Sequence, residues 1–284
     1  MERPEVIVLG GGPAGATVAA SLAQRGRHVL LLEREKFPRF HIGESLLPRS
    51  REVFQKLGIE AELDARFLRK YGARFLCATT GRTSSYRFSE AFDAPFEYAY
   101  QVRRDEFDHL LLRRAASLGA EVREQWRATS VIFEGDAAVG VRAAPTGAGP
   151  QDDVEIRASV VVDATGRDTL LASRTRRKAP VARLDKTAIF SHFTGIARPE
   201  GTAAGDIQIA IFEGGWFWFI PFRDGETSVG AVVGPAWMKQ RSPGESLDAL
   251  FDRTVLQCSW AADFLAGATR LRPCLLYTSP SPRD

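Results

Sequence analysis

The 284-residue sequence predicts an α/β fold, mixed α+β overall, and three observations carry this prediction. The apolar run Val6–Leu9 is followed by three glycines and an alanine-rich helical stretch that ends near Gln24. A second apolar run, His28–Glu33, follows that stretch, and a third, Val160–Asp163, ends in an acid and a glycine turn. Apolar runs that alternate with helical stretches are typical of buried parallel strands. The sequence therefore predicts a Rossmann-like core.

The glycines after the first run have the spacing G-x-G-x-x-G, with Pro13 and Ala14 inside the motif. In this pattern Gly10 permits a tight turn, and Gly12 lets the backbone approach a pyrophosphate at the helix N-terminus. Gly15 lets the helix pack closely on the strand. The motif therefore favours a phosphate-binding turn.

Glu33 ends the second run about twenty residues after the glycines, where an acid binds a ribose hydroxyl, and Arg34 follows it directly. Strand, glycines, helix, strand and acid in this register predict a site for an ADP-containing dinucleotide. The alternative is an ordinary βαβ turn that binds no ligand. Gly26 stands where a helix C-cap is expected.

The remaining sequence predicts a loop over 34–48, a helical region over 49–65 that breaks at Gly58, and a helix over 101–118 with Asp105 as its N-cap. Later alternating stretches predict strands, and residues 246–255 predict a helix. The expected strands are 67–77, 86–88, 120–126, 130–134, 138–144, 154–157, 187–196, 206–213, 216–221 and 228–233.

This order of elements predicts two domains. Residues 1–75 and 98–175 are expected to form the nucleotide-binding domain, which includes a small antiparallel sheet at about 122–157. Residues 76–97 and 176–273 are expected to form an inserted, antiparallel-sheet substrate domain. Residues 274–284 do not resemble their surroundings and are expected to be a non-native tail, so they are left out of the fold prediction.

The composition of the chain limits which kinds of function are expected. A net charge of +3 favours neither nucleic acid nor a membrane surface as a partner, and no apolar run is long enough to span a bilayer. The first strand begins too near Met1 for a signal peptide, so a cytoplasmic location is expected. The three cysteines and four histidines form no cluster, so we expect no metal site and no Ser-His-Asp triad.

Several stretches together resemble the flavin-dependent halogenases, over residues 5 to about 273. The glycine motif, Glu33, Gln101–Asp108 and Asp163–Arg167 are similar to the wider group of FAD enzymes that includes aromatic hydroxylases and geranylgeranyl reductases. The resemblance implies FAD as cofactor. In addition to the glycine motif, Glu33 and Arg34, it assigns FAD contacts to Gln101, Arg104, Asp163 and Gly166.

Two other stretches resemble halogenases in particular. Phe37–Pro48, followed by Lys70–Phe75, is similar to the Gly-Glu-Ser segment and the lysine of halogenases that act on phenols and pyrroles. The run Trp216–Pro221 is similar to the halogenase pattern W-x-W-x-I-P. The resemblance places Gly43, Glu44 and Ser45 along the flavin. It makes a substrate and tunnel wall of Trp216, Trp218, Ile220 and Pro221.

The resemblance also implies a reaction. FAD, reduced by a separate flavin reductase, would react with oxygen and chloride or bromide to give hypohalous acid, which Lys70 would steer to a small aromatic substrate. The substrate would be free or bound to a carrier protein. Lys70 would act as an ammonium that binds the acid or as an amine that is halogenated, and both roles suit a buried lysine. By its sequence position alone it could be a solvated lysine beside Arg69.

Three alternatives remain at this point. The chain could be a monooxygenase or a prenyl-chain reductase on the same fold, or an inactive flavoprotein fragment. The resemblance implies a third flavin motif, Gly-Asp followed by small residues, which does not occur before Asp284. The sequence is therefore expected to be the front part of a longer enzyme of secondary metabolism.

Overall fold

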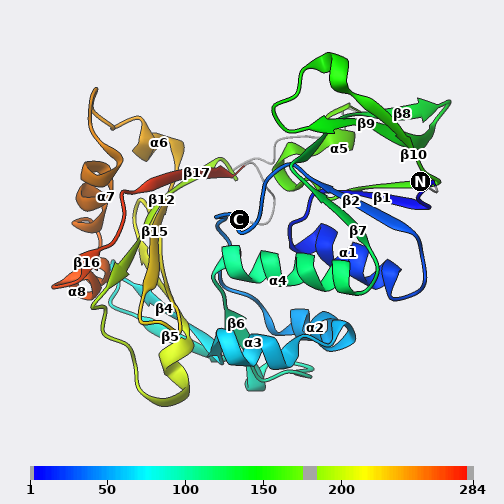
Figure 1. Cartoon of the computed structure of the whole chain (residues 1–284). Coiled ribbons are helices and arrows are strands. Elements are labelled where there is room, and N and C mark those ends of the chain that lie inside the picture. The colour runs from blue at the N-terminus through cyan, green and yellow to red at the C-terminus, as the bar shows by residue number, and fades with distance from the viewer. Residues whose placement is uncertain (1–2, 175–183, 280–284) are drawn as a thin grey trace. The chain divides into compact units, whose positions relative to one another are not determined.

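The structure is a computed structural model that describes residues 3–174 and 184–279 (Figure 1). The described residues form two compact units. Those of the first unit lie within Met1–Gly43 and Arg104–Ala179, and those of the second within Glu44–Arg103 and Pro180–Asp284.

The core of the first unit is a four-stranded parallel sheet in the order β11-β1-β2-β7. Its strands are β1 (Val6–Leu9), β2 (Val29–Glu33), β7 (Glu121–Glu124) and β11 (Val160–Asp163). Strands β1 and β2 are buried along their whole length, as an apolar run in a parallel sheet requires. Helix α1 (Pro13–Ala23) packs against helix α4 (Arg104–Ser117), as Figure 1 shows. The predicted Rossmann-like core is confirmed.

Local details of this unit refine the predictions. Helix α4 begins at Arg104, so Asp105 lies in its first turn and is not the N-cap. The small antiparallel sheet is present as β8 (Trp126–Glu134), β9 (Ala137–Pro145) and β10 (Val154–Arg157). It starts at residue 126, because the preceding strand β7 pairs with β2 in the parallel sheet. A short helix, α5 (Leu170–Arg174), follows β11.

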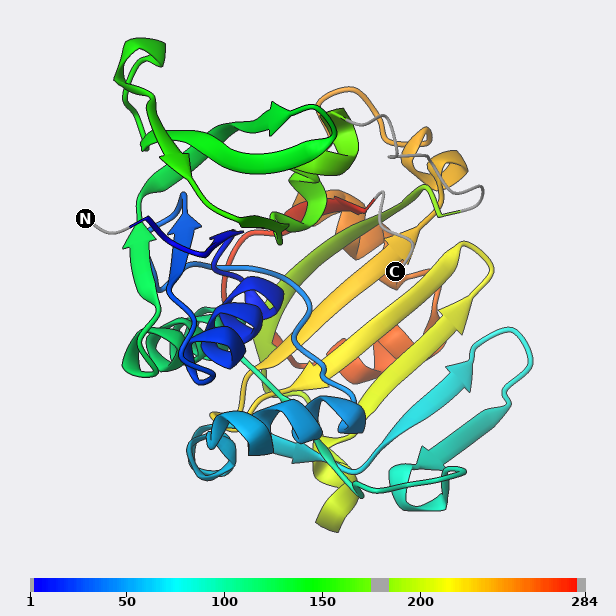
Figure 2. The same cartoon turned by 90° about the vertical axis from the view of Figure 1, so that its right-hand side faces the viewer.

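The second unit is built on an eight-stranded sheet, seen face-on in Figure 2. Seven strands follow the order β16-β12-β15-β14-β13-β4-β5, and β17 also pairs with β12. Neighbouring strands are antiparallel except β4 and β13, which are parallel, so the expected antiparallel sheet is in fact mixed. The bounds are β4 (Gly72–Cys77), β5 (Thr83–Arg87), β12 (Lys186–Thr194), β13 (Ile207–Phe212), β14 (Gly215–Pro221), β15 (Thr227–Val233), β16 (Thr269–Arg270) and β17 (Leu275–Ser279).

The units divide the chain differently from the expected domains. Residues 44–75 and 98–103 belong to the second unit, because β4 joins the larger sheet and β3 (Leu68–Lys70) pairs with β6 (Ala99–Gln101). Helices α2 (Arg51–Leu57) and α3 (Glu60–Arg66) precede β3 and are separated, as predicted, at Gly58. The expected domain boundary at residues 175/176 lies outside the described residues.

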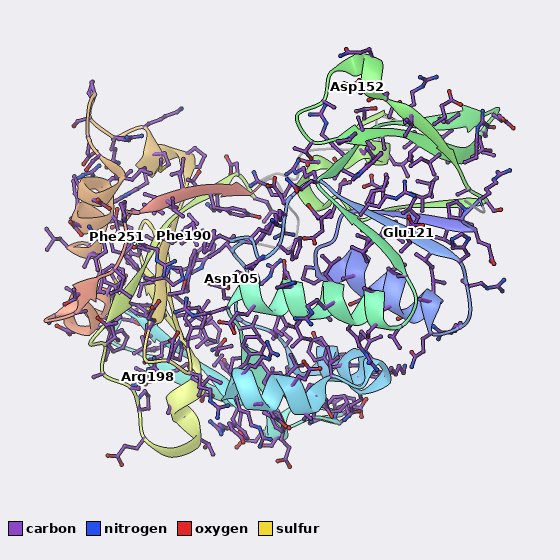
Figure 3. All side chains as sticks on the ribbon, viewed as in Figure 1. Asp105, Glu121, Asp152, Phe190, Arg198 and Phe251 are labelled. Carbon is purple, nitrogen blue, oxygen red and sulfur yellow. The ribbon has the colours of Figure 1, made fainter. Side chains whose placement is uncertain are left out.

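Helices cover one face of the larger sheet. They are α6 (Pro235–Met238), α7 (Leu247–Val255) and α8 (Ser259–Leu265), and the Ser246 side chain caps α7. Phe217 and Phe219 of β14 point to this face, where Phe217 packs edge-on against Phe251 at 6.0 Å between ring centroids. Phe190 of β12 lies on the opposite face (Figure 3). One face of the larger sheet is therefore packed into the hydrophobic core, and the opposite face carries candidate functional residues.

The end of the described chain joins the larger sheet. Cys274 is buried, and Leu275–Ser279 pairs antiparallel with β12, so residues 275–279 are part of the sheet. The unpaired backbone groups of a strand edge accept such a partner. Residues 280–284 lie outside the described residues. Within the described parts of the chain, no helix is both long and apolar enough to cross a membrane.

Candidate functional site

The glycine turn between β1 and α1 has the geometry that the sequence predicts. Gly10 has a φ of +97°, and a Cβ on it would lie 2.6 Å from the carbonyl oxygen of Ala164. A Cβ on Gly15 would lie 1.9 Å from the carbonyl oxygen of Gly10. The tight turn at Gly10 and the close packing at Gly15 are therefore confirmed.

Gly12 has free space around it, whereas Gly10 and Gly15 are in close contact with backbone atoms. A Cβ on it would meet one atom of the described residues, Nη2 of Arg39 at 3.5 Å. Pro13 and Ala14 follow as the first residues of α1, whose leading N–H groups have no partner within the helix and carry its partial positive charge. Arg39 adds a full positive charge beside them. This combination indicates an anion site, and a pyrophosphate fits it.

Arg39 and Arg104 share one buried carboxylate. Asp108 of α4 is 0% exposed and accepts from Arg104 Nε at 2.7 Å, from Arg104 Nη2 at 2.9 Å and from Arg39 Nη1 at 3.2 Å. One carboxylate shared by two guanidiniums leaves this group of three side chains with a net positive charge. Arg104 Nη1 also donates to the carbonyl oxygens of Ile42, at 2.5 Å, and Gly43, at 3.4 Å. Arg104 therefore ties this loop to α4, and its contact with FAD stays a prediction.

Glu33 is hydrogen-bonded to the glycine turn. Its buried carboxylate accepts the N–H of Gly11 at 2.6 Å on one oxygen and the N–H of Glu35 at 2.8 Å on the other. A carboxylate has about four acceptor positions, so two remain for the hydroxyls of a ribose. The predicted role of Glu33 is compatible with this geometry.

The other expected cofactor residues of the first unit are engaged in their own loops. Asp163 accepts the N–H of Thr165 at 3.1 Å and that of Leu171 at 2.7 Å, which orders the turn after β11. Gly166 begins the short turn there with a φ of +63°. Arg34 forms ion pairs with Asp168 and Glu35 at the surface. The residues Gly10, Arg34 and Asp163 all lie at carboxyl ends of parallel strands, the edge where such sheets bind ligands.

Lys70 is a buried ionisable group of the second unit. Its residue is 2% exposed, at the end of β3, and its Nζ donates to Ser45 Oγ at 2.8 Å. The Nζ atom lies 5.2 Å from the ring centroid of Phe88. Burial lowers the pKa of Lys70 to about 8, against an opposing effect of the Asp206 carboxylate. The predicted burial of Lys70 is therefore confirmed, and its catalytic role stays a prediction.

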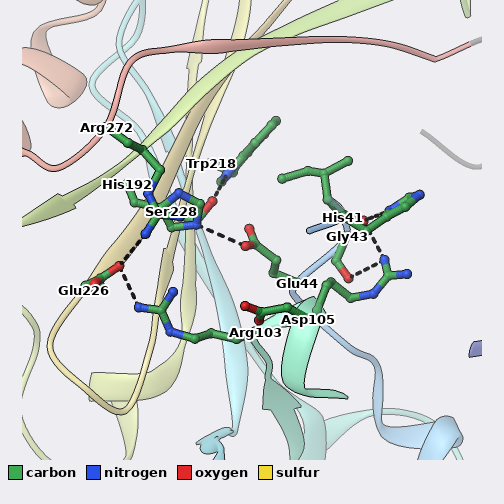
Figure 4. Close-up of polar contacts among 12 residues, drawn as sticks. His41, Gly43, Glu44, Arg103, Asp105, His192, Trp218, Glu226, Ser228 and Arg272 are labelled. Carbon is green, nitrogen blue, oxygen red and sulfur yellow. Dashed lines mark hydrogen bonds and ion pairs between the residues drawn. The ribbon is translucent and has the colours of Figure 1, made fainter. Parts of the chain in front are cut away.

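Glu44, next to Ser45, is bonded to a histidine that the sequence did not single out. Glu44 is 2% and His192 1% exposed, and Glu44 Oε1 lies 3.2 Å from Nε2 of His192 (Figure 4). His192 is on β12, and it stacks on Phe222 at 5.8 Å between ring centroids. Because 148 residues separate the pair, no local pattern points to it. Glu44 and Ser45 thus connect β12 to Lys70.

His192 leads on to the aromatic pair of β14. It lies opposite Ser228 of β15, and Ser228 Oγ accepts from Nε1 of Trp218 at 3.1 Å (Figure 4). The Trp218 ring also packs on Phe190 at 6.0 Å between ring centroids. A Cβ on Gly230 would lie 2.2 Å from that indole, so the glycine leaves the space in which the ring lies.

Trp216 and Trp218 share a face of the sheet, as predicted, and Phe217 and Phe219 point to the helix-covered core. We call the Trp side the aromatic face. Ile220 also belongs to it but is buried, as is Pro221 at the end of the strand. Strand register places further side chains on this face, among them Phe75, Tyr86, Ile209 and Ile211, and of these four all but Ile209 are well exposed.

Gln101 is placed in the second unit, on β6. It is 1% exposed, and its Nε2 donates to the carbonyl oxygen of Gly205 at 2.9 Å. Its backbone forms an isolated bridge with Ser45. The structure thus gives Glu44, Ser45 and Gln101 partners within their own unit, and their expected contacts with FAD stay predictions.

Gly230→Ala should displace the Trp218 indole. The added methyl group overlaps the ring, so we expect a loss of about 1–3 kcal/mol in unfolding free energy and altered tryptophan fluorescence. Gly234→Ala is the control, because its Cβ meets one described atom, the flexible Lys186 Nζ at 3.3 Å. Urea unfolding compares the variants. Equal losses in both would show that Gly230 does not seat the indole.

The parallel sheet, the open glycine turn and the positive charge beside it define a dinucleotide-binding protein of the FAD type. Comparison with known proteins agrees: a family described as "FAD binding domain" matches residues 3–230. The chain belongs to this family.

Several of its relatives and structural neighbours are flavin-dependent halogenases. The tryptophan 2-halogenase of Chondromyces crocatus is 30% identical over 271 residues, which are 95% of this chain and 51% of that protein. The pyrrole-2-carbonyl peptidyl-carrier-protein chlorinase of Pseudomonas fluorescens is 34% identical over 255 residues, which are 81% and 55%. The solved myxobacterial chondrochloren halogenase is 35% identical, with a TM-score of 0.87 over 98% of this chain and 64% of that one. The chain spans about half the length of these curated relatives.

Proposed function

We propose that the chain takes part in flavin-dependent halogenation of an electron-rich aromatic compound of phenol or pyrrole type. The observation that carries the proposal is the buried Lys70. Its amine is bonded to Ser45, and the adjacent Glu44 is bonded to His192 on the aromatic face. A lysine held in an apolar place without a full ion pair is costly, and such groups mark functional sites.

The residues present fit FAD. The leading N–H groups of α1 and the Arg39 guanidinium would hold its pyrophosphate, and Glu33 would hold its ribose. When bound and reduced by a separate flavin reductase, FAD supplies the two electrons with which oxygen converts chloride or bromide into hypohalous acid and water.

Lys70 binds the hypohalous acid that this chemistry produces. With its pKa lowered to about 8 by burial, it is mainly an ammonium at neutral pH. An ammonium has three N–H donors, of which Ser45 takes one. A second donates to the oxygen of the hypohalous acid. The halogen then bonds to a ring carbon, the ring loses its proton, and the hydroxide leaves as water.

The aromatic face supplies the surface for the substrate. Trp218 is fixed by Ser228 and Phe190, and its partly exposed neighbours are apolar. Offset or edge-on contacts with aromatic rings stabilise a bound aromatic compound by about 0.5–1.5 kcal/mol each. A phenol or pyrrole ring is compatible with such a surface.

The test supplies the chain with reduced FAD, oxygen, bromide and either a free phenol or a carrier-bound pyrrole. Mass spectrometry should detect a brominated product by its isotope pair. Hydroxylated product without brominated product would contradict the proposal and favour a monooxygenase. No FAD uptake and no product would favour an inactive flavoprotein fragment.

A further inference from the structure

We propose that Asp206 is a positioning residue for Lys70, which fixes the backbone beside the lysine and supplies the negative charge that favours its ammonium form. Its functional meaning rests on the proposed function, in which the Lys70 ammonium acts on the halogen. The geometric part rests on contacts within the second unit alone.

Asp206 holds the two residues that follow Lys70. It directly precedes β13 and is 9% exposed. Its Oδ1 accepts the N–H of Tyr71 at 3.0 Å, and it also receives a backbone hydrogen bond from Gly72. A Cβ on Gly72 would lie 2.3 Å from the carbonyl oxygen of Tyr86, so this strand junction has no space to shift.

Gly205 holds the residue that precedes Lys70. A Cβ on Gly205 would lie 1.9 Å from the carbonyl oxygen of Arg69, so the two backbones are in close contact. The carbonyl oxygen of Gly205 accepts from Gln101 Nε2, which anchors it to β6. The dipeptide 205–206 therefore contacts the chain on both sides of the lysine. This arrangement fixes the backbone from which the Lys70 side chain extends.

The charged groups around Lys70 are few. Arg69 directs its Nε to Asp64 at 2.8 Å, and Glu44 is bonded to His192. Asp206 is the charged group whose field raises the pKa of Lys70 against the effect of burial. Arg87 pairs with Asp206 through Nη1 and Oδ2 at 2.8 Å and partly neutralises it. Removing the Asp206 carboxylate should therefore lower the pKa of Lys70, and removing the Arg87 guanidinium should raise it.

The test measures the titration of Lys70 in the whole chain. The sequence contains six lysines, so side-chain ¹³C labelling of lysine gives six groups of NMR signals, and Lys70→Met assigns the one in question. Asp206→Asn should lower the midpoint of the Lys70 titration by about one pH unit, as expected for loss of a nearby opposite charge. Arg87→Gln should raise it, because the Asp206 carboxylate then acts without its partner.

Asp224→Asn is the matched control, because Asp224 also pairs with an arginine, Arg103, but makes no hydrogen bond or ion pair with residues 69–72. It should leave the midpoint unchanged. An unchanged midpoint in folded Asp206→Asn overturns the proposal, and if that variant does not fold, an unchanged or lowered midpoint in Arg87→Gln does so. The titration needs no halogenation, so failure of the proposed function would show separately, as absence of product with the expected shifts.

Discussion

Lys70→Met is expected to lower halogenation at least about a hundredfold, the effect of removing a group that acts on the transferring atom. Methionine fills a similar space but has no N–H to donate. Lys70 is expected to act only after the hypohalous acid has formed, so FAD affinity should be unchanged. Product yield and a flavin fluorescence titration measure the two effects. Lys56→Met, at an exposed lysine, should change neither.

The same substitution should stabilise the fold near neutral pH. The pKa of Lys70 is about 8 in the folded chain against 10.5 ordinarily, so the unfolded chain binds more protons between these values and stability rises with pH across this window. Below pH 8 the buried ammonium costs about 3 kcal/mol, offset by about 1 kcal/mol for the Ser45 hydrogen bond. Lys70→Met should thus gain about 2 kcal/mol at pH 7 and lose that advantage by pH 10.5. Retained halogenation, with no gain in stability, would show that Lys70 is not the strained functional lysine.

Gly15→Ala is expected to destabilise the first unit by about 3 kcal/mol or more, because its Cβ would lie 1.9 Å from the carbonyl oxygen of Gly10 and the backbone must move. Thermal or urea unfolding without cofactor measures this loss. FAD binding should disappear with the turn.

Gly12→Ala is the matched variant three residues earlier. Its φ of −67° suits any residue and its Cβ makes one ordinary contact, so stability should fall by about 1 kcal/mol or less, the cost of a poorer N-cap. FAD affinity should nevertheless fall at least about tenfold, or about 1.4 kcal/mol, because the methyl group occupies the place of the pyrophosphate. Unchanged FAD affinity in Gly12→Ala would move the pyrophosphate away from this turn.

Local signals in the sequence predicted the parts of this structure that depend on neighbouring residues. Apolar runs and glycine spacing located β1, α1 and β2, and two-residue periodicity put Trp216 and Trp218 on one face. The Asp105 cap was wrong because helix α4 begins one residue earlier, a choice that the capping pattern does not determine.

Contacts between residues far apart in the sequence could not be predicted from such local signals. The i,i+4 spacing of Arg104 and Asp108 was visible, but Arg39 joins them from 69 residues away from Asp108. His192 reaches Glu44 over 148 residues, and the histidines were expected to form no site. The partners of a strand are likewise set by the whole sheet, so the parallel pairing of β4 with β13 and the place of residues 275–279 emerged only from the structure.

If the buried Lys70 acts on the halogen as an ammonium, the rate of bromination must depend on the protonation of its amine. The rate should be measured with saturating reduced FAD and divided by the rate at which free hypobromous acid brominates the same phenol in the same buffers. We expect this ratio to fall as the pH rises through about 8, because the ammonium form of Lys70 is lost there. A ratio that stays constant or rises across this range would contradict this role of Lys70.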